Sequence, residues 1–436
     1  MRKSKSLKIM LSVAIILFIG KSMRAQENPL DTLANSVFKI KEDVDLMKRV
    51  KMSGYLQTQF QLADSNGTPS YAGGDFNAHT DKRFMLRRAR VKISYETPLT
   101  QYVFQIDATE KGFNIKDLYL KFTPRQINFV SLTVGCMNRP FGFEIGYSSS
   151  MRESPERGRM SQIIFPNERD LGAMLTFQLP KTSRWNFLKL EAGMYNGTSS
   201  SATDFDYKKD FIGRFRMDKS NKSEKINYGL GISYYNGGVR QGNNNICTIA
   251  SDNNGINGYV LNSDTAHYGK IAKREYIGAD FQINIDFSFG LTTLRAEYIQ
   301  GQQPGTSSTS KSPTSQPTSD TYLRSFNGAY FYFLQNIGKS KFQFVAKYDW
   351  YDPNTDVAGN DIGKTLTPYD GKTYKKTNST DIKYSTVGLG LAYRWDNNIK
   401  ITAYYDLVNN ETSDNLKGFN RNLKDNVFTL RVQYKF

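Results

Sequence analysis

Long hydrophobic runs are the first feature that this 436-residue sequence lacks. After the first two dozen residues, no stretch is apolar enough, for long enough, to cross a bilayer as a helix, so a helical membrane protein is excluded. The mean hydropathy of -0.55 is that of a hydrophilic chain. It is still compatible with a membrane β-barrel, because barrel strands alternate and only their outer faces need to be apolar.

Histidine and cysteine are also scarce. The two histidines, His79 and His267, fall in expected loops, so a hydrolase that pairs a strand serine with a histidine base is not indicated. The two cysteines, Cys136 and Cys247, are too few for a disulfide framework, and we expect both to be unpaired. These scattered residues provide no metal-ligand spacing. We therefore expect no catalytic residue, no metal site and no cofactor; an enzyme with a carboxylate base stays open as an alternative.

Aromatic residues, in contrast, are abundant, with 27 tyrosines and 28 phenylalanines. In the last ten residues, 427–436, apolar and polar residues alternate. One face carries Phe428, Leu430, Val432, Tyr434 and Phe436, and the other carries Thr429, Arg431, Gln433 and Lys435. A strand between lipid and water has this pattern, and its aromatic end fits the closing strand of a transmembrane barrel. The edge strand of a soluble sandwich is the alternative.

Residues 1–25 are predicted to form a secretory signal peptide. A basic start precedes an apolar run, 9–20, that is too short to span a membrane as a folded helix, and Ala25 offers a small residue for cleavage. Loss of this segment removes six basic residues and no acid, which lowers the formal net charge from +17 to +11. An uncleaved membrane anchor is the alternative. An exported chain without a basic tract or a nucleic-acid motif is not expected to bind nucleic acid.

The next segment, 26–51, is predicted to form a short periplasmic helix. Apolar residues recur at spacings of four, three, four and three, which is a heptad seam: Leu33, Val37, Ile40, Val44 and Met47. Two or three heptads are marginal for an isolated helix, so this one would be stable mainly as a coiled coil with copies of itself. A single amphipathic helix that packs on the rim of a barrel is the alternative.

From residue 52 onward the pattern is that of strands. We expect about sixteen, and an even number is the rule for bacterial barrels. Most are nine to thirteen residues long, which suits a tilted strand that crosses a bilayer. The expected strands are 52–61, 84–96, 100–109, 115–123, 128–135, 170–179, 185–195, 209–217, 225–235, 274–286, 290–300, 325–334, 341–350, 383–395, 398–407 and 427–436.

The connections between these strands alternate in length. Most linkers from odd to even strands are long and polar, such as 62–83, 236–273 and 351–382, with 110–114 as the short exception. Linkers from even to odd strands are short. With both termini on one side, this arrangement corresponds to short periplasmic turns and long extracellular loops. The sequence therefore predicts an all-β protein, in which residues 52–436 form an antiparallel transmembrane β-barrel of about sixteen strands in the outer membrane of a Gram-negative cell.

Residue parity indicates which side chains point into the barrel. In the strand 84–96, Arg88, Arg90 and Lys92 share the inward face, while Arg87 falls on the apolar side. Other strands place further cations inward: Lys121, Arg214, Arg216, Arg295, Lys347, Arg431 and Lys435. Rings of Arg and Lys favour anions, so we expect an anion preference. Inward acids are present too, and a water-filled pore with balanced charges is the alternative.

The linker 136–169 is unusual for an exposed loop because it combines several arginines with apolar residues. Its arginines are Arg139, Arg152, Arg157, Arg159 and Arg169. Its apolar residues include Phe141, Phe143, Ile163, Ile164 and Phe165. We expect this loop to fold into the barrel, to pack its apolar residues on the wall and to hold arginines across the pore as a constriction, since the planar Arg fork suits phosphate-like anions. A lid on the outer rim, or a loop that binds a neighbouring subunit, is the alternative.

Several segments in a fixed order carry a family resemblance. They are YLQTQFQ, RFMLRRARV, DLYLKFTP, VGCMNRPFGFE, RSFNGAYFYF, KFQFVAKYDWYDP and the terminal QYKF. Together they resemble the phosphate-selective porin O and P family in its Bacteroidetes-like form. The resemblance implies a 16-stranded trimeric outer-membrane channel with a basic interior, an inserted third long loop and a short amino-terminal helix. It also implies a basic path through Arg88, Arg90, Arg139, Arg157 and Arg159.

The sequence thus predicts an outer-membrane porin, a passive diffusion channel that prefers small anions, with phosphate or polyphosphate as candidate solutes. The expected partners are small inorganic anions, outer-membrane lipid and two further copies of the chain in a homotrimer. A general non-selective porin is one alternative. A barrel scaffold whose long loops bind an external partner is the other.

Overall fold

The computed structural model describes residues 29–200, 202–221 and 223–436. The predicted signal peptide, 1–25, lies outside the described residues. The chain divides into two compact units, one that ends at Lys51 and one that begins at Met52, and each is described by itself. Among the helices in these ranges, none is both long and apolar enough to cross a membrane.

The described part of the first unit consists mainly of the helix α2 (Pro29–Arg49), as the heptad spacing predicts. Its side chains from residue 33 onward are exposed, including every residue of the predicted seam. Met47, for example, is 72% exposed. An isolated helix of this length is marginal in water, so self-association through the seam stays a prediction.

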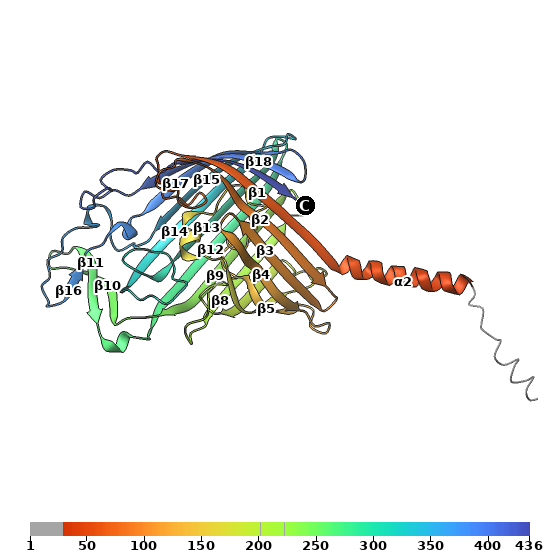
Figure 1. Cartoon of the computed structure of the whole chain (residues 1–436), viewed down its shortest axis with the longest axis horizontal. Helices are drawn as coiled ribbons and strands as arrows, with labels where there is room; N and C mark the ends of the chain where they lie inside the picture. Colours follow the sequence, from red (N-terminus) through yellow and green to blue (C-terminus); the bar gives the residue numbers. More distant parts are fainter. Residues whose placement is uncertain (1–28, 201, 222) are drawn as a thin grey trace, which may run out of the picture. The chain divides into compact units, whose positions relative to one another are not determined.

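The second unit is a closed antiparallel barrel of sixteen strands (Figure 1). The strands that form it are β1 (Val50–Ala63), β2 (Lys82–Glu96), β3 (Thr100–Thr109), β4 (Gly112–Phe122), β5 (Val130–Asn138), β6 (Arg169–Gln178), β7 (Leu188–Tyr195), β8 (Asp210–Ser220), β9 (Ile226–Arg240), β12 (Ile271–Phe287), β13 (Gly290–Gly305), β14 (Thr321–Asn336), β15 (Phe342–Asp352), β17 (Tyr384–Arg394), β18 (Ile399–Asn410) and β19 (Val427–Lys435). Each lies within a few residues of an expected strand, so the predicted fold is confirmed.

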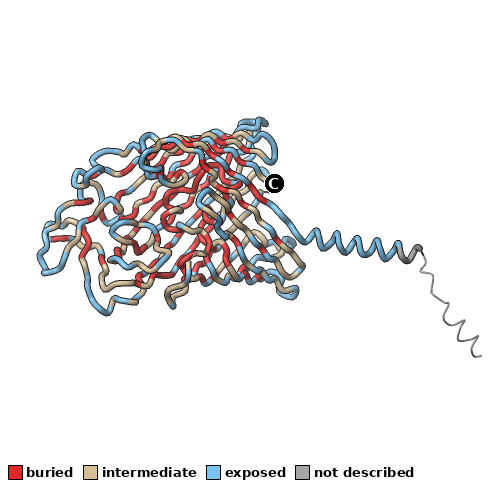
Figure 2. Tube along the Cα trace, viewed as in Figure 1, coloured by how far each residue is buried: buried red, intermediate tan, exposed pale blue. Residues whose placement is uncertain are grey.

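The first and last strands close the barrel. β19 pairs with both β18 and β1, and in the second pairing Tyr55 lies opposite Lys435 and Ala63 opposite Val427. Buried and exposed positions alternate along the strands (Figure 2). On β19, Arg431 is 4% exposed, while its neighbour Val432 is 42% exposed. The apolar face therefore points outward and the polar face inward, which is the arrangement of a membrane barrel.

The connections sort by length as predicted. At one end of the barrel the turns are short, for example 97–99, 288–289 and 395–398. At the other end most linkers are long, and the exception is the tight turn between Thr109 and Gly112.

Three short strands in the long linkers were not expected from the sequence. The hairpin of β10 (Asn245–Ser251) and β11 (Asn257–Ser263) pairs with the start of β14 and with β16 (Thr373–Lys375). Its small core contains Cys247, Tyr259 and Tyr322. These strands were missed because the pairing joins linkers that are far apart in the sequence, and the Asn- and Gly-rich composition of 236–258 shows no strand period. Cys136 and Cys247 are both buried and free.

Candidate functional site: a basic cavity beside the inserted loop

The long loop between β5 and β6 lies inside the barrel. Gln57 on β1 and Lys400 on β18 donate hydrogen bonds to its backbone carbonyls at 3.0 and 2.8 Å. Glu297 on β13 accepts two hydrogen bonds from its backbone N–H groups. The inserted loop comprises residues 139–168, because β5 takes the first three residues of the expected linker and β6 the last. Since its contacts reach strands all around the wall, the loop narrows the interior of the barrel.

Apolar residues attach one side of the inserted loop to the wall. Phe141, Ile163, Ile164 and Phe165 are buried in a cluster with side chains from β9, β12, β13, β14 and β15, namely Tyr235, Tyr276, Ile299, Phe326 and Val345. Ring centroids in this cluster lie 5.2 Å apart for Phe141 and Phe165. The loop also contains the short helix α3 (Arg159–Ile164), which presents Ile163 and Ile164 to the cluster. This side of the barrel interior is filled by side chains.

A carboxylate of the wall holds the start of the loop. Oε2 of Glu297 accepts hydrogen bonds from the backbone N–H groups of Phe143 and Glu144, both at 3.0 Å, and from the hydroxyl of Tyr330 at 2.7 Å. Gly142 has a φ of +57°, and a Cβ at this position would collide with Oε1 of Glu297. A glycine is therefore required where the carboxylate approaches the loop backbone.

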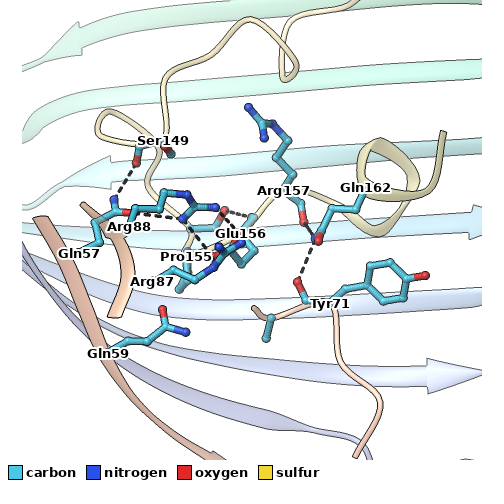
Figure 3. A network of polar contacts seen from close by, with 12 residues as sticks. Gln57, Gln59, Tyr71, Arg87, Arg88, Ser149, Pro155, Glu156, Arg157 and Gln162 are labelled. Carbon is cyan, nitrogen blue, oxygen red and sulfur yellow. Dashed lines mark hydrogen bonds and ion pairs between the residues drawn. The ribbon is translucent and has the colours of Figure 1, made fainter. Parts of the chain in front are cut away.

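Glu156 in the middle of the loop accepts three guanidinium groups. Figure 3 shows those of Arg87 and Arg88 beside its carboxylate. Arg87 and Arg88 on β2 reach its two oxygens at 2.8 and 2.7 Å, and Arg431 on β19 contacts it at 2.7 Å. Both Arg88 and Glu156 are buried. Burial would raise the pKa of the Glu156 carboxyl, but the three arginines hold it well below its usual range. The negative charge of Glu156 thus ties the loop to β2 and β19, the two neighbours of β1 in the barrel.

The position of Arg87 corrects a prediction. Residue parity placed it on the apolar outer side, but its guanidinium reaches Glu156 together with that of Arg88. The pairing of β2 with β3 begins only at Ala89, so the pleat of that ladder does not constrain the preceding residues. Inward and outward side chains do not alternate strictly at Arg87 and Arg88. Both turn inward, where they form ion pairs with the buried carboxylate of Glu156.

The other arginines of the loop are nearly all engaged by the protein itself. Arg139 pairs with Asp170 at 3.2 Å, and Arg157 pairs with Glu168. The guanidinium of Arg159 lies 3.8 Å from the ring centroid of Tyr384. All three arginines are less than a tenth exposed. For Arg139 and Arg157 this differs from the expected arginine constriction, because N–H groups of both are already used by acceptors of the protein and are not free for a solute.

Arg152 is the exception among these arginines. It is 2% exposed, and none of its three guanidinium nitrogens has a hydrogen-bond partner among the described residues.

Most candidate cations on the strands are also paired with carboxylates. The pairs are Arg90 with Asp107, Arg169 with Asp117, Arg214 with Asp280, Arg216 with Asp218, and Lys347 with Asp349. Lys92 and Lys121 differ from them. Neither forms an ion pair with a residue in the described ranges, and both are only half-buried.

Two adjoining cavities lie between the inserted loop and the wall. The first, of about 460 Å³, is bounded by the loop and by strands β2 to β8. The second, of about 360 Å³, shares Lys92, Asp117 and Tyr147 with the first and extends to β1 and β19. Ten basic side chains line the two cavities: Arg90, Lys92, Lys121, Arg139, Arg157, Arg169, Lys189, Arg214, Arg216 and Lys435. Within the described ranges, two acidic side chains line them, Asp117 and Glu191.

The candidate residues from the sequence divide into two groups. Eight of the thirteen line these cavities: Arg90, Lys92, Lys121, Arg139, Arg157, Arg169, Arg214 and Arg216. The other five do not line these cavities: Arg88, Arg152, Arg159, Lys347 and Arg431. Arg88 and Arg431 hold the loop through Glu156, and the backbone carbonyl of Arg152 accepts the hydrogen bond from Lys400. Arg159 and Lys347 line a smaller neighbouring cavity. Lys189 was missed, although its place two residues before Glu191 on β7 puts both on the inward face and could have identified it.

Comparisons with known proteins agree with the fold. No protein-family model matches the chain, and no curated protein matches it. The outer membrane channel DcaP of Acinetobacter baumannii is similar in structure, with a TM-score of 0.50 and 12% identity over 89% of this chain and 97% of that chain. An anion-selective porin from Comamonas acidovorans has a TM-score of 0.50 and 10% identity over 89% of this chain and 99% of that chain. At such identities the likeness concerns the fold alone, so this chain has the fold of the outer-membrane porins.

Proposed function

We propose that the protein is a passive diffusion channel of the outer membrane that prefers small anions. The observation that carries this proposal is the lining of the two cavities, with ten basic and two acidic side chains. Many of these charges are paired with carboxylates, but Lys92, Lys121 and Lys435 form no ion pair within the described residues. A positive lining concentrates anions and lowers their barrier to entry. Phosphate and polyphosphate are the inorganic candidates among the solutes.

The proposed location follows from the barrel and from the predicted signal peptide. Export by residues 1–25 would deliver the chain to the periplasm, and insertion of the apolar outer face would place it in the outer membrane with lipid around it. The long linkers would then face the outside of a Gram-negative cell.

We also propose that the channel is a homotrimer. The stretch of wall from β2 to β5 has the tight turn at the end of the barrel where the other connections are long, and its outer face is strongly apolar. Phe84 is 85% exposed and Phe113 is 81% exposed. An apolar outer wall contacts lipid, and on this stretch, where a tight turn replaces a long linker, it can also pack on a neighbouring subunit. The exposed seam of α2 offers a second surface for the same assembly.

The deciding experiment is the zero-current potential of the purified protein in a planar bilayer under a KCl gradient. We expect a potential of the sign that indicates permeation of chloride over potassium. Addition of phosphate to one side then tests whether it reduces the chloride current. A potential near zero would instead favour a general porin, and a cation-selective potential would contradict the proposal.

A scaffold that binds an external partner is the second candidate function. The ordered hairpin of β10 and β11, which pairs with β14 and β16, favours it, because a simple channel does not need a structured linker. Deletion of residues 245–263 tests this candidate. Conductance that is unchanged, together with loss of binding to intact cells or to other envelope proteins, would support it.

A further inference from the structure

The larger cavity has two unlike walls. The inserted loop presents Phe143 and Tyr147 to it, with their ring centroids 4.9 Å apart and the rings tilted by 34°. Both rings are half-buried, whereas the other aromatic anchors of the loop are fully buried in the cluster against β9 and β12 to β15. The strands present mainly basic and polar side chains, including Lys92 and Lys121. A solute in this cavity therefore meets an aromatic surface and a cationic surface together.

Whether the cations without an ion-pair partner are arginines or lysines decides which class of anion the cavity can bind. Tight recognition of phosphate uses the planar fork of arginine, which bonds two oxygens at once. The arginines in this cavity already hold carboxylates, since Arg139 pairs with Asp170, Arg214 with Asp280 and Arg216 with Asp218. Among the cations that line this larger cavity, the two without an ion-pair partner in the described ranges are Lys92 and Lys121. A lysine ammonium is a strongly hydrated point charge that attracts any anionic head without demanding the geometry of phosphate.

The aromatic wall adds a second requirement. A fully hydrated inorganic anion gains nothing from contact with Phe143 and Tyr147, because both are apolar over most of their surface. The guanidinium of Arg295 covers part of these rings, since its Cζ lies 4.5 and 4.6 Å from the centroids of Phe143 and Tyr147. An organic anion with a planar apolar body removes apolar surface from water against the part that remains uncovered. The planar body of such a solute would contact the aromatic wall, and its charged head would contact the cationic wall of the same cavity.

We propose that the preferred solutes of this channel are organic carboxylates with a planar apolar body, of which benzoate is the simplest probe. The carboxylate lies near Lys92 and Lys121, and the body lies against Phe143 and Tyr147. This inference rests on the proposed function as an anion channel and names the solute class for the same cavity. Each contact is weak enough for release, as transport requires.

The first test uses the unmodified protein. Zero-current potentials are measured with potassium chloride on one side and potassium acetate, benzoate or phosphate on the other. Acetate is the smaller carboxylate, so sieving by size alone favours it. We expect benzoate to be more permeant than acetate by about threefold, which corresponds to the contribution of one aromatic contact. Acetate equal to or above benzoate, or phosphate above both, would overturn the inference.

These outcomes separate the inference from the function on which it rests. Anion selectivity in KCl with permeabilities that follow size leaves the proposed channel in place and removes the solute class. Cation selectivity, or a potential near zero, contradicts the anion channel itself.

The second test removes one ring. In Tyr147→Ser, we expect the permeability of benzoate relative to acetate to fall by about threefold, toward the order set by size. The matched control is Tyr234→Ser, since Tyr234 lies on the exposed outer face of β9 and lines neither cavity. A ratio that is unchanged in Tyr147→Ser would contradict the assignment of the aromatic wall. Lys121→Gln should lower the permeability of both carboxylates by a similar factor.

Discussion

Arg88 and Glu156 form a buried ion pair, with Nη2 of the arginine 2.7 Å from Oε2 of the carboxylate. The arginine belongs to the barrel wall and the carboxylate to the inserted loop. This contact, together with those of Arg87 and Arg431, makes the position of the loop depend on one negative charge. The cavities beside the loop exist in their present shape only while this attachment holds.

Replacement of Glu156 tests the attachment. In Glu156→Gln, three guanidinium groups lose their shared charge, two of them fully buried, and we expect a loss of about 3–5 kcal/mol in the free energy of unfolding. Thermal unfolding in detergent measures the effect, and single-channel recordings should show a larger and less steady conductance. Asp361→Asn removes an exposed ion pair with Lys364 and should change stability by less than about 1 kcal/mol. Equal effects of the two substitutions would contradict the role assigned to Glu156.

Gly142 is the second point where the loop depends on one residue. Gly142→Ala adds a Cβ that collides with Glu297 and forces a positive φ on a residue with a side chain, which we expect to cost about 1–3 kcal/mol. Proteolysis of the loop in the folded barrel should become faster. Gly146→Ala is the control in the same loop, since its Cβ would meet only ordinary van der Waals contact. A stable Gly142→Ala protein with a protected loop would show that the close approach is not required.

The unpaired lysines are expected to contribute most of the anion preference. In Lys92→Gln combined with Lys121→Gln, the permeability of chloride relative to potassium should fall by about two- to fivefold, because the cavity loses two charges that form no ion pair within the described residues. Reversal potentials in a KCl gradient provide the measurement. Lys273→Gln is the matched control, since Lys273 is exposed and lines neither cavity. If the control and the double variant behave alike, the selectivity arises elsewhere.

A pH dependence is expected from the linker that precedes β19. Burial raises the pKa of the Asp425 carboxyl to about 6, although Arg159 opposes the shift, and its Oδ1 has no hydrogen-bond partner in the described part of the chain. The folded protein therefore binds more protons than the unfolded chain between about pH 4 and pH 6, and the stability from this group falls as the pH rises through that range. Above about pH 6 the carboxyl is charged and its burial is unfavourable.

Asp425→Asn removes this titration. The unfolding temperature of the variant relative to the unmodified protein should rise by about 1–2 °C between pH 4 and pH 7. Asp414→Asn is the control, because Asp414 is exposed in the same linker. A difference that does not change with pH would show that the charge of Asp425 is not suppressed by burial.

The amino-terminal helix provides a prediction about assembly. Val37→Asp combined with Val44→Asp places charges in the heptad seam and should weaken self-association of the chain, measured by light scattering in detergent. Phe38→Asp is the matched control, since Phe38 is 68% exposed on a different side of the helix. Loss of the oligomer in both variants alike would indicate that the seam has no special role.

The sixteen strands and the inward cations follow from the sequence because both are local. Period-two alternation decides the faces of a strand, and this placed Arg88, Arg90 and Lys92 inward without knowledge of the fold. The length of each linker decides the end of the barrel at which it lies. Even the apolar residues of the inserted loop, such as Phe141 and Phe165, were visible as anomalies in a polar segment.

Only the tertiary structure decided which of these charges are available to a solute. Arg88 meets Glu156, and Arg214 meets Asp280, across distances of 68 and 66 residues in the chain. No spacing rule links such positions, because the partners come together only when the barrel closes and the loop enters it. The same closure left Phe143 outside the buried aromatic cluster, and it left Lys92, Lys121 and Lys435 as the cavity cations without an ion pair among the described residues. The local sequence decides which residue types face the interior of the barrel, but ion pairs between residues far apart in the chain decide which of their charges stay available to a solute.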